Sequence, residues 1–543
     1  MVSLWRLIGM ATKTISYRKT GRFSNLILDY LNEDKRLESF YSLFPTPENL
    51  YKQARLKLDN YAMDTRKVLC DVIAEQYEDI SISVEVENNL KALKSNHTVT
   101  ITTGHQLCLM TGPLFFIYKI VSAIKMCHHL SEKYPDIHFV PVYWMATEDH
   151  DFEEIRSFVF QDKKIQWDDQ AGGAVGRMTL AHLQSTLDLF ERDLGKNTRS
   201  KNLKKIIQDS YRSATYLADA TRIFVNALFS SYGLIIIDGD NSRLKQLFTP
   251  YLKTELTLGP CQRNVRIQNE LLQKKYDNSF KPQVTPRDIN LFYLDAKGRY
   301  RIEKKEGYYV LDGHPKTFTK DSVLEELNNY PERFSPNVLL RPLYQEVVLP
   351  NICYIGGGGE LSYWFQLKLF FDDQKVLFPA LALRNSALLM NAKISKKALD
   401  LNLKGEELFL KKSELINRKV KEISDISLDL SFLKKRLEEQ FDYLDALVQK
   451  TEASFAGAVA AQKAKQFKGI THLEKRLLKA QKRKLNDHVN RIETLYESLF
   501  PNNTLQERQL NFTDFYMETG ADFIPLLIKS FEPFQYRFNL IEY

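Results

Sequence analysis

Cysteine is scarce in this sequence. The 543 residues include five cysteines, and no two of them are closer than 19 positions. An odd number at such spacing excludes a disulfide framework and a CxxC metal knuckle. We therefore expect reduced thiols and a cytoplasmic location.

Long apolar runs are also absent, because no stretch approaches the roughly 20 residues that a membrane helix requires. Hydrophobic residues make up 44% of the chain and charged residues 27%, which excludes a disordered or fibrous protein. The length is several times that of a typical domain. The sequence thus predicts a soluble protein of more than one structural unit, with no membrane partner.

Short apolar segments alternate with helical periodicity over much of the chain. Five of them have the composition of buried strands, at residues 99–102, 138–145, 234–237, 352–355 and 376–383. Strands that alternate with helices are typical of right-handed βαβ crossovers. The predicted fold class is α/β, with a doubly wound parallel sheet.

Changes in composition divide the chain further. We expect a helical lead-in, three core parts, two insertions, a helical arm and a C-terminal segment that packs on the core. Their ranges are 1–97 for the lead-in, 98–154, 231–280 and 336–388 for the core, 155–230 and 281–335 for the insertions, 389–500 for the arm and 501–543 for the last segment.

The arm has no proline and few glycines between residues 391 and 500. Apolar residues recur at steps of three or four from Leu430 to Val448, and a second series runs from Leu485 to Leu499. This spacing predicts an antiparallel α-helical coiled coil in which two long helices fold back on each other.

The loop after the first predicted strand is the first candidate site. Glycine and Pro113 suit a tight turn and a helix start, where a phosphate or carboxylate could bind. The loop matches neither standard phosphate-binding fingerprint. We assign His105 as a candidate acid or base, and Gln106, Thr111, Gly112 and Lys119 as candidate substrate-binding residues.

Four titratable residues, Glu148 to Asp151, follow the second predicted strand. They could act as a general base that also binds a substrate amine, as metal ligands with His105 and Asp240, or as a solvated turn whose acids cap a helix. The carboxyl ends of parallel strands form the ligand-binding edge, which favours function. We assign Glu148, Asp149 and His150 to catalysis and Asp151 to substrate binding.

Two further clusters follow later strands. A run of four glycines ends in Glu360, which allows close approach of the backbone to a ligand. Arg384 and Asn385 could bind a carboxylate or cap a helix. The substrate-binding candidates here are Gly358, Gly359, Glu360, Tyr363, Arg384 and Asn385.

Several long motifs resemble the BshC family of bacillithiol biosynthesis. They are TTGHQLCLMTGPLFFIYK (102–119), PVYWMATEDHDFEEI (141–155), SPNVLLRPLYQEVVLPNICYIGGGGELSYW (335–364), LEKRLLKAQKRK (473–484) and LFPNNTLQER (499–508). The resemblance implies a Rossmann-like core with two connecting-peptide insertions and a coiled-coil arm through which the protein forms a homodimer. It also implies a ligase that joins L-cysteine to glucosaminyl malate through an amide bond. The family pattern has glutamine where this chain has His105.

An amide bond requires an activated cysteinyl carboxyl group, so a nucleotide, ATP or ADP, is the candidate cofactor. We expect the helix start after Gly112, together with Arg384, to hold anionic groups, and Asp149 or Glu148 to take the proton of the amine. Two alternatives remain open. One is a metal-dependent hydrolase with His105, Glu148, His150 and Asp240 as ligands, and the other is a nucleic-acid-binding protein that uses a basic arm.

The formal net charge of +8 has one source. Residues 461–484 hold nine basic residues and one acid, which gives +8, so the rest of the chain is neutral. Such a run is usually a solvated face. Lys475, Lys479 and Lys482 share one helical face and form a second candidate site, for a nucleotide or phosphate.

Overall fold

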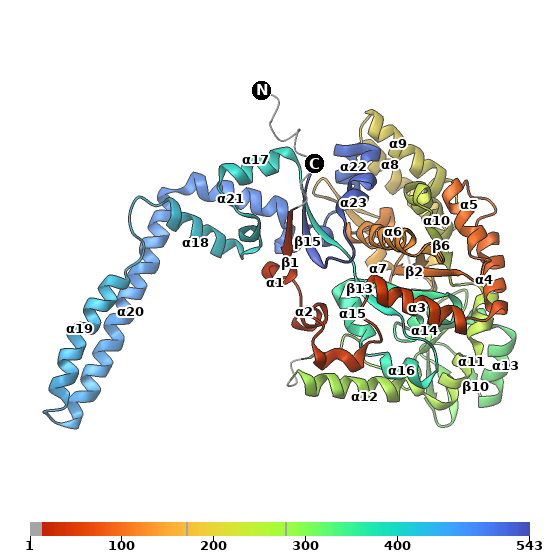
Figure 1. Cartoon of the computed structure of the whole chain (residues 1–543), viewed down its shortest axis with the longest axis horizontal. Coiled ribbons are helices and arrows are strands. Elements are labelled where there is room, and N and C mark those ends of the chain that lie inside the picture. The colour runs from red at the N-terminus through yellow and green to blue at the C-terminus, as the bar shows by residue number, and fades with distance from the viewer. Residues whose placement is uncertain (1–12, 170–171, 277–279) are drawn as a thin grey trace. The chain divides into compact units, whose positions relative to one another are not determined.

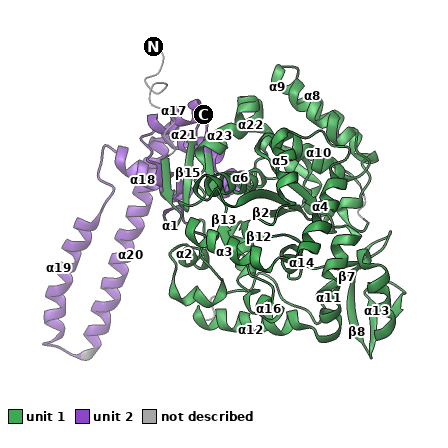
Figure 2. Ribbon diagram, turned by 45° about the vertical axis from the view of Figure 1, so that its right-hand side comes forward, with its two compact units in different colours: residues 1–18, 22–388, 506–541 green, residues 19–21, 389–505, 542–543 purple. Residues whose placement is uncertain are grey.

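The computed structural model describes residues 13–169, 172–276 and 280–543. The chain forms two compact units, coloured separately in Figure 2. The larger unit comprises residues 1–18, 22–388 and 506–541, and the smaller one residues 19–21, 389–505 and 542–543. Among the described residues, no helix combines the length and the apolar character needed to cross a bilayer.

The larger unit is built on a five-stranded parallel sheet, which confirms the predicted α/β class (Figure 1). Its strands in spatial order are β13 (Ala380–Leu383), β12 (Asn351–Gly356), β2 (Thr98–His105), β3 (His138–Met145) and β6 (Ile235–Asp238). Numbered along the chain, the order is 5-4-1-2-3, the arrangement of a Rossmann sheet. The strand order therefore reverses between β2 and β12.

All seven residues from Thr98 to Gly104 of β2 are buried, as expected for a central parallel strand covered on both faces. Leu50 of α3 (Pro47–Asn60) and Cys127 of α6 (Phe115–Lys133) join Val99, Ile101 and other strand residues in one apolar cluster. The register aligns His105 with Met145 and Met145 with Asp238. The carboxyl ends of β2, β3 and β6 therefore form one edge.

The last predicted strand begins later than expected. Pairing with β12 starts at Ala380 rather than at residue 376. Lys375 has a φ of +56°, and Pro379 has no N–H to donate to a sheet. The apolar residues between them belong to an irregular connection.

Helices surround this sheet and fill the connections. They are α2 (Asn25–Leu31), α3 (Pro47–Asn60), α4 (Met63–Gln76), α5 (Val84–Ala92), α6 (Phe115–Lys133), α7 (Phe152–Ile155), α8 (Gln184–Asp193), α9 (Thr198–Ile207), α10 (Leu217–Phe229), α11 (Ser242–Leu258), α12 (Pro260–Lys275), α13 (Lys320–Asn329), α14 (Arg341–Val348), α15 (Gly358–Trp364), α16 (Lys368–Asp373), α22 (Phe512–Thr519) and α23 (Phe523–Ser530).

Smaller sheets occupy the insertions and the chain ends. The first insertion holds the antiparallel pair β4 (Ser157–Phe160) and β5 (Lys163–Gln166). The second holds an antiparallel sheet of β7 (Leu291–Leu294), β8 (Arg299–Lys305), β9 (Tyr308–Leu311), β10 (Thr317–Phe318) and β11 (Phe334–Pro336). A third sheet has the order β1 (Lys13–Ser16), β15 (Arg537–Glu542) and β14 (Ser386–Met390).

The smaller unit contains the coiled coil. Helices α19 (Ser431–Val448) and α20 (Ala453–Lys484) are joined by residues 449–452 and pack Leu437 and Phe441 against Val459. The prediction that the series Leu485 to Leu499 would supply the partner helix was wrong, because that series forms α21 (Asn486–Leu499), which packs on α17 (Ala392–Asp400) and α18 (Lys412–Ile423). The alanine-rich start of α20 has few large apolar residues, so its pairing is poorly marked in the sequence.

Candidate active site

A cavity of about 750 Å³ lies at the carboxyl ends of the parallel strands. The ends of β2, β3 and β12 line it, together with residues of the second insertion and Arg508 of the C-terminal segment. It includes the point between β2 and β12 where the strand order reverses, which is the usual ligand position in such sheets. Of the sequence-predicted residues it brings together His105, Gln106, Lys119, Glu148, Asp149, His150, Gly359, Glu360, Tyr363 and Arg384.

Lys119 and Glu360 form an ion pair at the switch point, in which Lys119 is buried and Glu360 is 25% exposed. Lys119 Nζ lies 2.6 Å from Glu360 Oε2 and donates to the carbonyl of Gly104 at 2.8 Å. The Glu360 carboxylate also accepts hydrogen bonds from the Gly357 N–H and the Tyr354 hydroxyl. Burial opposes its ionisation, but Lys119 and the Gly357 N–H outweigh burial and lower the pKa of Glu360. This pair ties α6 and α15 to the ends of β2 and β12.

Asp149 is held as a carboxylate. Gln106 Nε2 donates to its Oδ2 at 2.8 Å, and the backbone N–H of His150 donates to its Oδ1 at 2.8 Å. Burial opposes the charge, but hydrogen bonds from His150 and Gln106 and the charge of Arg299 hold the pKa of Asp149 well below its usual range. A carboxylate of this kind can bind a cation but is a weak proton acceptor.

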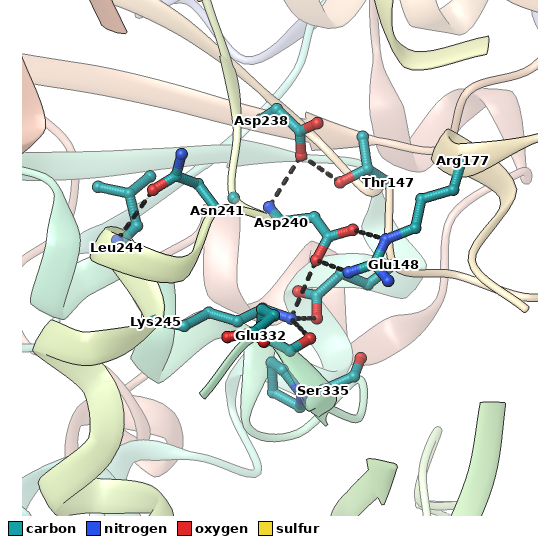
Figure 3. Close-up of polar contacts among 12 residues, drawn as sticks. Thr147, Glu148, Arg177, Asp238, Asp240, Asn241, Leu244, Lys245, Glu332 and Ser335 are labelled. Carbon is teal, nitrogen blue, oxygen red and sulfur yellow. Dashed lines mark hydrogen bonds and ion pairs between the residues drawn. The ribbon is translucent and has the colours of Figure 1, made fainter. Parts of the chain in front are cut away.

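Unlike its neighbour Asp149, Glu148 pairs with a buried lysine, Lys245 (Figure 3). Its Oε1 lies 2.6 Å from Nζ of Lys245, which is 1% exposed and also lies 3.1 Å from Oδ1 of Asp240. Arg177 in turn donates to both oxygens of Asp240 at 2.7 and 2.8 Å. Burial raises the pKa of Glu148, and Lys245 offsets this only in part. The two adjacent carboxylates therefore have pKa shifts of opposite direction.

Asp238 completes this network at the end of β6. It accepts hydrogen bonds from the Asp240 N–H and the Thr147 hydroxyl. Burial and the charge of Asp240 raise the pKa of Asp238, whereas Lys245 and Arg177 lower the pKa of Asp240 despite its burial. Lys245 therefore stabilises the ionised carboxylate of Asp240 and also contacts Glu148, whose pKa is raised.

His150 lies beside Arg299 from the second insertion. Its Nδ1 is 3.1 Å from Arg299 Nη1, and since a guanidinium can only donate, Nδ1 must accept this hydrogen bond. Arg299 packs over the Phe292 ring at 4.1 Å and donates to the carbonyl of Pro336 at 2.9 Å. The second insertion thus supplies a fixed cation next to the catalytic candidates.

His105 is enclosed by aromatic rings. Its ring lies 5.1 Å from that of Phe116, and Nε2 lies 3.8 Å from Cys108 Sγ. Burial, followed by the charges of Lys119 and Arg384, lowers the pKa of His105 well below its usual value. A histidine in these surroundings is neutral at pH 7.

Two family models match this chain over nearly its whole length. The N-terminal Rossmann-like domain of bacillithiol biosynthesis BshC matches residues 10–385, and the C-terminal coiled-coil domain of BshC matches residues 387–543. The chain belongs to the BshC family. Relatives named "Putative cysteine ligase BshC" include those of Flavobacterium johnsoniae, 47% identical over 98% of this chain and 100% of the relative, and Christiangramia forsetii, 48% identical over 98% and 99%.

Other predicted residues of this BshC chain lie outside the cavity lining. Leu114 N donates to Leu510 O at 2.8 Å, and Asn511 bonds the carbonyl of Gly112, so the C-terminal segment covers the start of α6. Thr111 and Gly112 belong to this covered loop. Asp151 caps α7 by accepting from the Glu154 N–H, which is the capping alternative for this residue.

Two further predicted residues also have structural contacts in place of cavity contacts. Gly358 packs on Ile27, and Asn385 donates to the carbonyl of Glu532 at 3.1 Å. Neither is part of the cavity lining.

The metal-ligand alternative has little geometric basis in this BshC chain. Glu148 and Asp240 converge on the ammonium of Lys245, and His150 faces the guanidinium of Arg299. Within the described part of the chain, no group of three or more His, Cys, Asp or Glu side chains is arranged to hold a metal ion.

The second candidate site of this BshC chain lies on α20. Lys475 and Lys479 are exposed and Lys482 is half-buried. They are spaced by four and three residues, so they follow one face of the helix.

Sequence reasoning missed several cations of the BshC site, among them Lys245, Arg299 and Arg341. Lys245 lies inside an amphipathic helix, and Arg299 lies in the insertion. Arg341 stands in the motif that carries the resemblance, immediately before Pro342 at the start of α14. That helix start, in the segment leading into β12, is the signal that could have pointed to it.

Proposed function

We propose that this BshC protein is a cysteine ligase of bacillithiol biosynthesis that joins the carboxyl group of L-cysteine to the amine of glucosaminyl malate. The observation that carries the proposal is the mixed charge of the cavity. Asp149 and Glu148 provide carboxylates for an amine, while Arg299 and Arg341 provide cations for carboxylates or phosphate. Both substrates combine groups of these two kinds.

Amide formation from a free carboxylate requires activation. In the proposed reaction, the cysteine carboxylate first takes a phosphoryl or adenylyl group from ATP, which releases ADP or pyrophosphate. The amine nitrogen of glucosaminyl malate then attacks the acyl carbon, the C–N bond forms, and phosphate or AMP leaves with the C–O bond electrons. One proton must leave the nitrogen during this step.

Because the pKa of Asp149 is lowered and that of Glu148 is raised, the two carboxylates have different roles in the proposed reaction. Asp149 stays ionised and holds the amine in place, and Glu148, the more basic group, takes the proton. His150 lies next to both Asp149 and Arg299, with its Nδ1 3.5 Å from Asp149 Oδ1 and 3.1 Å from Arg299 Nη1. His105, neutral and enclosed, contributes to the shape of the cavity, and Gln106 positions Asp149.

The basic face of α20 is the proposed nucleotide-binding site outside the cavity. No ion pair within 4.0 Å is present for Lys475, Lys479 or Lys482 in the described residues. Three ammonium groups without ion-pair partners on adjacent turns could therefore bind the phosphate groups of a nucleotide.

The coiled coil is the proposed homodimer interface. Phe432, Tyr443 and Leu473 expose 55%, 69% and 57% of their surface, although they belong to the two helices that form the coil. A second copy would cover these side chains. Light scattering should give the mass of two chains, and replacing Phe432 and Tyr443 by serine should give the mass of one.

The reaction itself can be tested directly. Purified protein is incubated with L-cysteine, glucosaminyl malate and ATP, and the mixture is analysed by mass spectrometry for the amide-linked thiol and for AMP or ADP. We expect the thiol together with one nucleotide product in equal amount. Absence of the thiol with both substrates and ATP present would refute the proposal.

A further inference from the structure

Arg341 differs from the other buried cations around the cavity. It lines the cavity near the switch point, and its Nη2 is buried with no hydrogen-bond acceptor among the described residues. No described carboxylate lies within ion-pair distance of its guanidinium, whereas its four buried counterparts each have one. These pairs are Lys119 with Glu360, Lys245 with Glu148 and Asp240, Arg299 with Asp149, and Arg384 with Glu507.

The guanidinium of Arg341 is held in place by neutral groups. Its Nη1 donates to Gln345 Oε1 at 3.0 Å, and the side chain hydrogen-bonds with Tyr363. Gln345 is fully buried and donates in turn to Glu346 at 2.8 Å. The side chain is therefore fixed without an ion pair of its own, although the nearby charge of Glu360 contributes to raising the pKa of Arg341.

Gly104, near the end of β2, leaves space for the side chain of Arg341. A Cβ atom at Gly104 would lie 3.4 Å from Arg341 Nη1, so glycine allows the guanidinium to pack against the backbone of β2. A buried guanidinium without an anion is costly, and a bidentate carboxylate or phosphate is the ligand that best matches its planar donors.

We infer that Arg341 is the residue that receives an anionic group of the substrates, either a malate carboxylate of glucosaminyl malate or the phosphate of the activated cysteine. This inference rests on the proposed function for the identity of the substrates. It transfers the anion-binding role expected of Arg384 to Arg341, because Arg384 already has a carboxylate partner.

Isothermal titration calorimetry can test the inference without turnover. The probes are glucosaminyl malate, its malate dimethyl ester, and a non-hydrolysable cysteinyl-adenylate analogue. We expect Arg341→Gln to weaken one charged probe at least tenfold. If Arg341→Gln loses affinity for glucosaminyl malate but not for the dimethyl ester, the group bound by Arg341 is a malate carboxylate. If it loses affinity for the adenylate analogue, the group bound is the phosphate. Arg266→Gln, the same charge change at an exposed position of α12 outside the cavity lining, should weaken neither more than threefold.

Unchanged affinity of Arg341→Gln for both charged probes, or equal losses in Arg266→Gln, would overturn the inference. If Arg341→Gln does not fold by circular dichroism, Arg341→Lys replaces it. Since lysine cannot form the bidentate contact, we expect at least a threefold loss, and an unchanged affinity again overturns the inference. Binding that depends on Arg341 in a protein that makes no amide would leave this inference standing and remove the proposed function.

Discussion

Arg384 Nη2 lies 2.6 Å from Glu507 Oε1, and the two side chains are 4% and 1% exposed. The residues are 123 positions apart, so this pair joins the C-terminal segment to the turn after β13. Glu507 also accepts from the Ser386 hydroxyl and the Ala387 N–H. The C-terminal segment is therefore an electrostatic part of the cavity wall.

Replacing Glu507 by glutamine should destabilise the larger unit, because a buried guanidinium would lose its carboxylate. Removal of one partner of a buried ion pair costs on the order of 3 kcal/mol. Urea unfolding followed by tryptophan fluorescence measures the change. Glu532→Gln is the control, since that residue is half-exposed and lies 3.9 Å from Lys125, and we expect less than about 1 kcal/mol there. Equal effects would contradict this account.

Lys245→Met should change the pH dependence of the reaction. Without the ammonium, the pKa of Glu148 rises further, so the acid limb of the rate profile should move to higher pH and kcat should fall at least tenfold. Lys253→Met provides a control on the same helix, because Lys253 is exposed. A loss of rate with an unmoved acid limb would show that Glu148 is not the base.

Glu346 should give the protein a pH-dependent stability. Burial, only partly offset by Lys57, raises its pKa to about 7. The folded state therefore keeps a proton that the unfolded state loses above about pH 4.3, and the free energy of unfolding falls as pH rises through this window toward 7. The slope for one group is at most about 1.4 kcal/mol per pH unit.

Glu346→Gln removes this titration. Relative to the wild type, the variant should become more stable as pH increases from 5 to 8, and guanidinium unfolding at several pH values measures the difference. A difference that is constant with pH would contradict the shifted pKa.

The basic face of α20 gives a separate prediction. Replacing Lys475, Lys479 and Lys482 together by glutamine should weaken ADP binding at least tenfold, as measured by calorimetry at low salt. The same change at Lys393, Lys396 and Lys397, three exposed lysines of α17, should have little effect. Undiminished binding in the α20 variant would remove the proposed nucleotide site.

Much of the fold could be predicted because polar residues or glycines directly follow the apolar strand segments in the sequence. The apolar segment before Thr147 and the segment before the glycine run both became strands of the sheet, and their polar ends line one cavity. The pairing of α19 with α20 could not be predicted, since it depends on a short turn and on small residues that carry little periodic signal.

The ion pairs of the site could not be predicted from the sequence either. That Arg384 is paired with Glu507, while Arg341 has no ion pair among the described residues, depends on contacts between segments far apart in the chain. Residue type and spacing identify candidate cations, but they do not show which of them already has a partner.

The central claim is that the amide bond is formed in the cavity at the carboxyl edge of the sheet. The most direct test compares the rate of thiol product formation, by mass spectrometry, for the wild type, Asp149→Ala, His150→Ala and Glu153→Ala, whose carboxylate is exposed on α7. We predict losses of at least a hundredfold for Asp149→Ala, at least tenfold for His150→Ala and less than threefold for Glu153→Ala. Wild-type rates in both Asp149→Ala and His150→Ala would contradict the claim.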